Sequence, residues 1–226
     1  MPTPRKYKAP LFAEMQYHLI FRTVDGVPLF REPFNKVFFR KRYKHYLHPM
    51  LSTLANNLME NHAHFIVKIK SIKDLKKSIS KIPEEKRTKR MKEFLEAEDP
   101  TLLVNAMILR QINSFLVSYA MSYNKLYNRK GGMFHSPCRR VVVKDAKHLK
   151  HGIVYVNANA QKHHLVDDFR TYPDTSYHDV LANSSSIISI KPVLDFFGGR
   201  EEFIKSHEQI VAFYYSTGWQ FDTLPP

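Results

Sequence analysis

The stretch Asn61-His62-Ala63-His64-Phe65 constrains the fold of this chain more than any other. It lies between two apolar runs, residues 51–59 and 65–69, which predict two strands joined near residue 60. Because side chains in a strand alternate between its faces, His62 and His64 should point the same way. Two neutral imidazoles at this spacing can share one metal ion. The spacing alone fits a pair of exposed or hydrogen-bonded histidines equally well.

The charge of the chain favours a polyanionic partner. Lys and Arg number 35 against 21 Asp and Glu, a formal net charge of +14 in 226 residues. Nucleic acid is favoured over a membrane surface, because no amphipathic helix with an exposed apolar face accompanies the basic runs. A basic protein that is merely soluble is the alternative.

Length and composition indicate one folded domain with an appendage in a reducing compartment. No apolar run approaches the roughly 18 residues of a transmembrane helix, and no apolar segment follows the basic N-terminus as in a signal peptide. The single cysteine, Cys138, excludes an intrachain disulfide and fits the cytoplasm, where we expect it to be a buried, inert thiol.

The first half of the chain predicts a strand over residues 14–23 and a helix from about Glu32 to His48. Pro49 ends this helix, because the residue before proline avoids the helical region. The helix interleaves aromatic residues, expected to be buried, with cations expected to contact DNA phosphates. These cations are Lys36, Arg40, Lys41, Arg42 and Lys44. The basic run 70–92 fits either a solvated helical face or a DNA contact.

The second half predicts a long helix over residues 101–128, a strand over 139–143 and a helix over 145–161. Tyr119, Tyr123 and Tyr127 form one stripe of the long helix, a pattern more typical of core than of catalysis. The buried stripe of the helix over residues 145–161 consists of Leu149, Ile153, Val156 and Ala160. Tyr155 and Asn159 lie one turn apart on its polar side, where a surface tyrosine is the simpler interpretation.

Four ordered blocks then resemble a known family. Leu58-Met59-Glu60-Asn61-His62-Ala63-His64 resembles the Leu-Met-Pro-Asn-His-Val-His motif of the single-tyrosine HUH transposases, specifically their REP-associated branch. Residues 17–22 resemble the first strand of the family, residues 115–134 its long helix and glycine turn, and residues 155–160 its Tyr-Ile-x-x-Asn-Pro block. Glu60 and Ala160 stand where the family usually has proline, which affects turn geometry rather than catalytic atoms.

This resemblance implies an α+β fold, a ferredoxin-like antiparallel sheet with packed helices. It implies a catalytic domain over residues 12–180, between a basic lead-in (1–11) and a C-terminal helical appendage (181–226).

The resemblance also implies the chemistry. Tyr155 would attack a phosphodiester of single-stranded or hairpin DNA, form a 5′-phosphotyrosine and allow strand transfer. His62, His64 and Asn159 would hold Mg²⁺ or Mn²⁺.

Several alternatives stay open on the sequence. Arg139 and Arg140 are further candidates for phosphate contacts. His18, His135, His148 and His151 are candidate ligands, although a structural role suits each better.

A DNA-binding protein without catalysis could use the same sheet, and a rolling-circle initiator or relaxase shares the histidine pair. Relatives act as homodimers or alone, so the oligomeric state is open.

Overall fold

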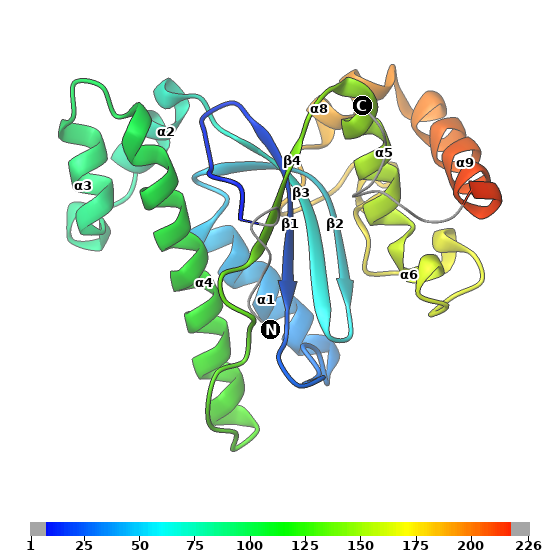
Figure 1. The fold of residues 1–226 in the computed structure, drawn as a ribbon, viewed down its shortest axis with the longest axis horizontal. Coiled ribbons are helices and arrows are strands. Elements are labelled where there is room, and N and C mark those ends of the chain that lie inside the picture. Colours follow the sequence, from blue (N-terminus) through cyan, green and yellow to red (C-terminus); the bar gives the residue numbers. More distant parts are fainter. Residues whose placement is uncertain (1–7, 218–226) are drawn as a thin grey trace.

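A four-stranded antiparallel sheet separates two helical layers in the computed structural model, which describes residues 8–217 (Figure 1). The sheet order is β2-β3-β1-β4. Its strands are β1 (Gln16–Arg22), β2 (Leu51–Met59), β3 (His62–Ile69) and β4 (Arg139–Val143). With one helix between β1 and β2 and another before β4, this order is the ferredoxin-like split βαβ topology. The predicted fold class is therefore confirmed.

The pairing of β1 with β3 decides which side chains share a face of the sheet. His64 lies opposite Ile20, and His62 lies opposite Arg22. Their neighbours Ala63 and Phe65 therefore project from the other face, as the period-two alternation predicts. The predicted hairpin is confirmed, because β2 pairs with β3 with Met59 opposite His62.

The apolar face of the sheet packs against α1 (Pro33–Tyr46) and α4 (Val104–Leu126). The Phe65 ring stacks on Tyr43 with centroids 4.5 Å apart, and Phe115 of α4 meets Phe39 at 4.9 Å. Both helices were predicted at nearly these bounds.

The tyrosine stripe of α4 is structural, as predicted. The hydroxyls of Tyr119 and Tyr123 donate to the carbonyls of Leu29 and Pro28, each at 2.6 Å. These bonds fix the loop between β1 and α1 to α4.

Within the described residues, one helical stretch, Thr101–Leu126, is long and apolar enough by composition to cross a membrane. Its apolar side chains Ile108, Ile112 and Phe115 are fully or almost fully buried. Other apolar side chains of the same stretch, such as Val117 and Met121, are exposed. The short turn Thr101–Leu103 precedes α4, and α3 (Lys89–Glu96) lies on the far side of α4 from the sheet (Figure 1). Helix α2 (Ile72–Ser80) and the short turn Glu84–Lys86 come between β3 and α3 in the chain, and α2 contacts α3.

The histidine face of the sheet is covered by α5 (Ala146–Asn157) and α6 (Asn159–Lys162). The prediction of one continuous helix over residues 145–161 is wrong. Ala158 leaves the helical conformation, with φ −91° and ψ 3°, so α6 begins again at Asn159.

Among the C-terminal elements, α9 (Arg200–Thr217) packs on α5 from the side away from the sheet (Figure 1). Helices α7 (Ser176–Leu181) and α8 (Ile190–Phe197) contact the edge strand β2, and the short turn Phe169–Thr171 contacts α6. Phe203 and Tyr214 of α9 are fully buried within the same core as the sheet. The sequence predicts an extended tail over residues 217–226; Thr217 instead ends α9, and residues 218–226 lie outside the described range.

The N-terminal end is less separate than predicted. Residues 1–7 lie outside the described range, but Leu11 is fully buried and its amide donates to Asn105 Oδ1 at 3.0 Å. Residues 8–11 therefore pack on the core, because an apolar side chain and a backbone donor both find partners there.

Candidate active site

Three imidazoles lie in a row on the sheet face beneath α5. The ring of His18, from β1, stacks on that of His64 with centroids 5.0 Å apart, and the His64 ring meets His62 at 4.9 Å. A fourth ring, His163 just beyond α6, lies 5.2 Å from His62. The predicted histidine pair is therefore side by side, in a larger group of imidazoles that spacing within one strand could not reveal.

Tyr155 lies over this row. Its ring meets those of His18 and His64 edge-on, with centroids at 6.2 Å and 6.4 Å. Helix α5 and strand β3 thus bring together the two side-chain types that the sequence selected, within a single chain.

Tyr155 and Asn159 are both enclosed, which corrects the prediction of a wet helix face. Tyr155 is only 7% exposed and Asn159 is fully buried. For Tyr155 the cause is α9, which covers the side of α5 that faces away from the sheet, whereas α6, which carries Asn159, contacts β2 and residues 169–171. The Tyr214 hydroxyl donates to the His151 carbonyl at 3.1 Å, and its ring packs edge-on against Tyr155 at 6.2 Å.

Unsatisfied polar atoms mark the centre of the site. Within the described residues, neither amide atom of Asn159 has a hydrogen-bond partner, and neither has His64 Nε2. Buried polar groups are nearly always paired, so such atoms call for a ligand. Two imidazole nitrogens and one amide oxygen are a donor set that suits a divalent cation. That the Asn159 amide lies close enough to the two imidazoles to share an ion with them stays a prediction.

No group of three or more His, Cys, Asp or Glu side chains in residues 8–217 is placed to hold a metal ion. A metal centre in this part of the chain therefore requires a ligand of another kind, and an asparagine amide oxygen is one.

The protonation state of the histidines suits metal binding. Burial, reinforced by His163, Arg22 and Lys162, lowers the pKa of His62 to about 4. Burial and the neighbouring imidazoles of His18 and His62 hold the pKa of His64 well below its usual value. Both imidazoles are therefore neutral near pH 7, the form that binds metal ions.

Lys162 contacts the hydroxyl of Tyr155. Its ammonium donates to Tyr155 Oη at 2.5 Å and lies 4.6 Å from the centre of the ring. No role is predicted for Lys162 from the sequence. Its spacing of seven residues from Tyr155, about two helical turns, is the signal that could have identified it.

The C-terminal helix also fixes the end of α5 through a buried polar network. His207 Nε2 lies 2.9 Å from Asn157 Nδ2, and the Ser176 hydroxyl donates to Asn157 Oδ1 at 2.6 Å. His207 is fully buried among aromatic rings, and burial lowers its pKa to about 4. Asn157 is thus satisfied where Asn159, two residues later, is not.

The predicted phosphate contacts of α1 do not converge on this site. Helix α1 lies in the opposite layer, across the sheet from α5 (Figure 1). Lys36 and Arg40 pair with Asp174 at 2.5 Å and 3.0 Å. Arg42 donates to the Tyr46 hydroxyl at 2.9 Å, whereas Lys41 and Lys44 are exposed.

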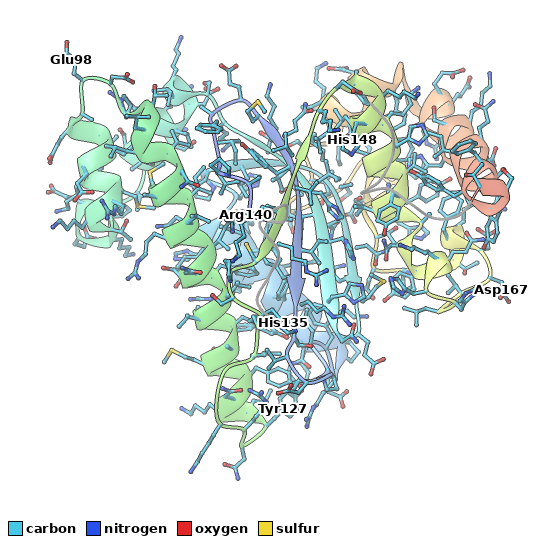
Figure 2. The ribbon with its side chains drawn as sticks, viewed as in Figure 1. Glu98, Tyr127, His135, Arg140, His148 and Asp167 are labelled. Atoms are coloured by element: carbon cyan, nitrogen blue, oxygen red, sulfur yellow. The ribbon has the colours of Figure 1, made fainter. Side chains whose placement is uncertain are left out.

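The two arginines of β4 separate because adjacent residues face opposite sides. Arg139 pairs with Ile20 and lies on the histidine face. Arg140 lies on the other face (Figure 2), where it is 5% exposed and donates to the carbonyls of Ala9 and Cys138, each at 3.0 Å. The prediction of Arg140 as a phosphate contact is therefore wrong. Cys138 is buried, as predicted, and burial raises the pKa of its thiol.

Fold and site together define a ferredoxin-like α+β protein whose sheet carries a histidine pair facing a tyrosine on a helix. The solved structure of a REP-associated tyrosine transposase bound to a REP hairpin matches this chain with a TM-score of 0.50. The match covers 88% of this chain and 98% of the other at 14% identity. It confirms the predicted resemblance at the level of the fold. No family model and no curated protein sequence matches the chain.

Replacing Asn159 should separate stability from ligand binding. In EDTA, Asn159→Leu should raise the free energy of unfolding by about 1–2 kcal/mol, because it removes a buried amide that has no partner. The same change at the paired amide, Asn157→Leu, should lower it by about 2 kcal/mol, because His207 and Ser176 lose their partner. Denaturant unfolding measures both. A loss of stability in Asn159→Leu equal to that in Asn157→Leu would contradict the description of this amide.

Proposed function

We propose that this chain nicks single-stranded or hairpin DNA and transfers the cut strand through a 5′-phosphotyrosine on Tyr155, in the manner of the HUH transposases. The observation that carries the proposal is the packing of the Tyr155 ring against His64, whose outer nitrogen is buried and has no partner in residues 8–217. Support comes from the fold, which is shared with a transposase solved on a DNA hairpin, and from the net charge of +14.

The reaction is a transesterification. Tyr155 Oη attacks a phosphorus atom, the Oη–P bond forms, and the bond from phosphorus to the 3′-oxygen breaks. The phenolic proton passes to water, and the departing 3′-oxygen takes a proton from water. Because the phosphotyrosine keeps the energy of the phosphodiester, a 3′-hydroxyl can later reverse the attack and join strands without ATP.

The residues of the site divide this work. His62, His64 and Asn159 would hold Mg²⁺ or Mn²⁺, and a bound cation would polarise the scissile phosphate. Arg22, opposite His62, and Arg139, on the same face, would attract the DNA backbone. Lys162 would stabilise the negative charge that develops on the phenol oxygen, because its ammonium already contacts that atom.

The site needs no second copy of the chain. Tyr155 and His64 of one molecule are in contact, and α9 of the same molecule holds the tyrosine helix in place. We therefore propose that one chain carries out the cut, whether or not it dimerises on DNA.

Tyr155→Phe should abolish the covalent adduct between the protein and a labelled single-stranded hairpin, while binding of that DNA survives. The ring and its packing stay, and only the attacking oxygen is removed. Denaturing gels measure the adduct with Mn²⁺ or EDTA, and EDTA should also prevent it. The control is Tyr119→Phe, which changes a buried tyrosine of α4 and should still form the adduct. An adduct from Tyr155→Phe would refute the assignment, and binding without any adduct from the wild type would favour a DNA-binding protein without catalysis.

Lys162→Met should slow adduct formation by about 10²-fold at saturating DNA, since a donor to the reacting oxygen is lost. Lys162→Arg should keep most of the rate, and Lys125→Met, an exposed lysine of α4, should keep all of it. A substrate with sulfur in place of the 3′-bridging oxygen tests the role, because its leaving group needs no proton. The defect should persist on that substrate. If it disappears, Lys162 assists the leaving group instead.

A further inference from the structure

His18 contacts the inner nitrogen of His64 directly. It is 1% exposed, and its Nε2 lies 2.7 Å from His64 Nδ1. The register of β1 and β3 explains the contact. Ile20 is directly opposite His64. His18, two residues before Ile20, is therefore the diagonal neighbour of His64 on the same face, and the two rings can reach each other.

A bond between two imidazole nitrogens admits two arrangements of the proton. In the first, His64 Nδ1–H donates to His18 Nε2, and His64 Nε2 carries a lone pair. In the second, His18 Nε2–H donates to His64 Nδ1, and a neutral His64 carries its own proton on Nε2. Only the first arrangement lets His64 bind a cation through its outer nitrogen.

The neighbouring histidine favours the first arrangement. His62 Nδ1 lies 2.6 Å from Asn61 Oδ1, an oxygen that can only accept, so His62 has its proton on Nδ1 and its lone pair on Nε2. The cost of a buried proton does not choose between the arrangements, because the second puts one on His64 Nε2 and the first puts one on His18 Nδ1. Only the first leaves a lone pair on His64 Nε2, the nitrogen that matches the lone pair of His62. The two histidines would then present the same nitrogen.

We infer that His18 is a positioning residue, which accepts a hydrogen bond from His64 Nδ1 and so keeps the lone pair of His64 on Nε2. The functional consequence rests on the proposed metal-dependent reaction. The tautomer itself is a property of the metal-free protein and can be measured without DNA or activity.

Long-range ¹H–¹⁵N correlation spectra of the metal-free wild-type protein at pH 7.5 test the tautomer, with assignment by comparison with His64→Asn. The expected result is a protonated Nδ1 and an unprotonated Nε2 in His64. A proton on Nε2 of His64 would overturn the inference, whatever the protein does to DNA.

Two substitutions test the consequence. His18→Phe removes the acceptor, and Mn²⁺, titrated without DNA and followed by electron paramagnetic resonance, should bind about 10–100-fold more weakly. His18→Gln offers an amide oxygen to His64 and should bind close to wild type. Ile20→Val, on the same strand and face, controls for altered packing and should not change the affinity.

Equal Mn²⁺ affinities in His18→Phe and Ile20→Val would overturn the positioning role. If the wild type binds no Mn²⁺, the proposed function fails, and the spectrum of His64 still decides the tautomer. If His18→Phe does not fold, the Mn²⁺ affinities of His18→Gln and Ile20→Val are compared instead. An unchanged affinity in His18→Gln supports the positioning role. A weaker affinity in His18→Gln than in Ile20→Val opposes it.

Discussion

The antiparallel pairing of β1 with β3 is the constraint on which the site depends. It places His62 and His64 on the face beneath α5 and brings His18 beside His64. On the other face, the same register places Phe21 and Phe65 against each other and against the helices α1 and α4. A slip of one residue in a strand would turn its imidazoles towards the apolar core and its phenylalanines away from it. The burial of those rings therefore fixes the position of the histidines.

The second requirement is an enclosed tyrosine helix. Helix α9 packs on α5 through Tyr214 and His207, so Tyr155 approaches the imidazoles from a helix that is covered on both sides. Burial strengthens each electrostatic contact in the site, because the local dielectric constant is lower than in bulk water. Among the described residues it also leaves the Asn159 amide and His64 Nε2 without partners, at a cost of about 1–3 kcal/mol for each unsatisfied group. A protein that keeps such atoms buried gives up stability at the point where a ligand would restore it.

Much of this arrangement could be predicted from local patterns. The alternation of residues 62–65 predicts the shared face of His62 and His64, whereas the antiparallel α+β fold was implied by the resemblance of the ordered blocks to a known family. The burial of Tyr155 could not be predicted, because it depends on α9, some fifty residues further along the chain. Arg140 shows the same limit. Its charge suggests a phosphate contact, but the strand register turns it toward Ala9 and Cys138. His18 was one of several candidate histidines, and its contact with His64 was recognisable only once β1 and β3 were paired. The spacing of Lys162 from Tyr155 is visible in the sequence, but the contact between them is not.

The central claim is that His62, His64 and Asn159 surround one cation beneath Tyr155. Crystals soaked in Mn²⁺ test it most directly, with data collected to record the anomalous scattering of manganese. We expect a single manganese peak beside the Tyr155 ring, bonded to Nε2 of both histidines and to Asn159 Oδ1. Manganese elsewhere on the protein with none at this position, or an Asn159 amide turned away from a bound ion, would contradict the account.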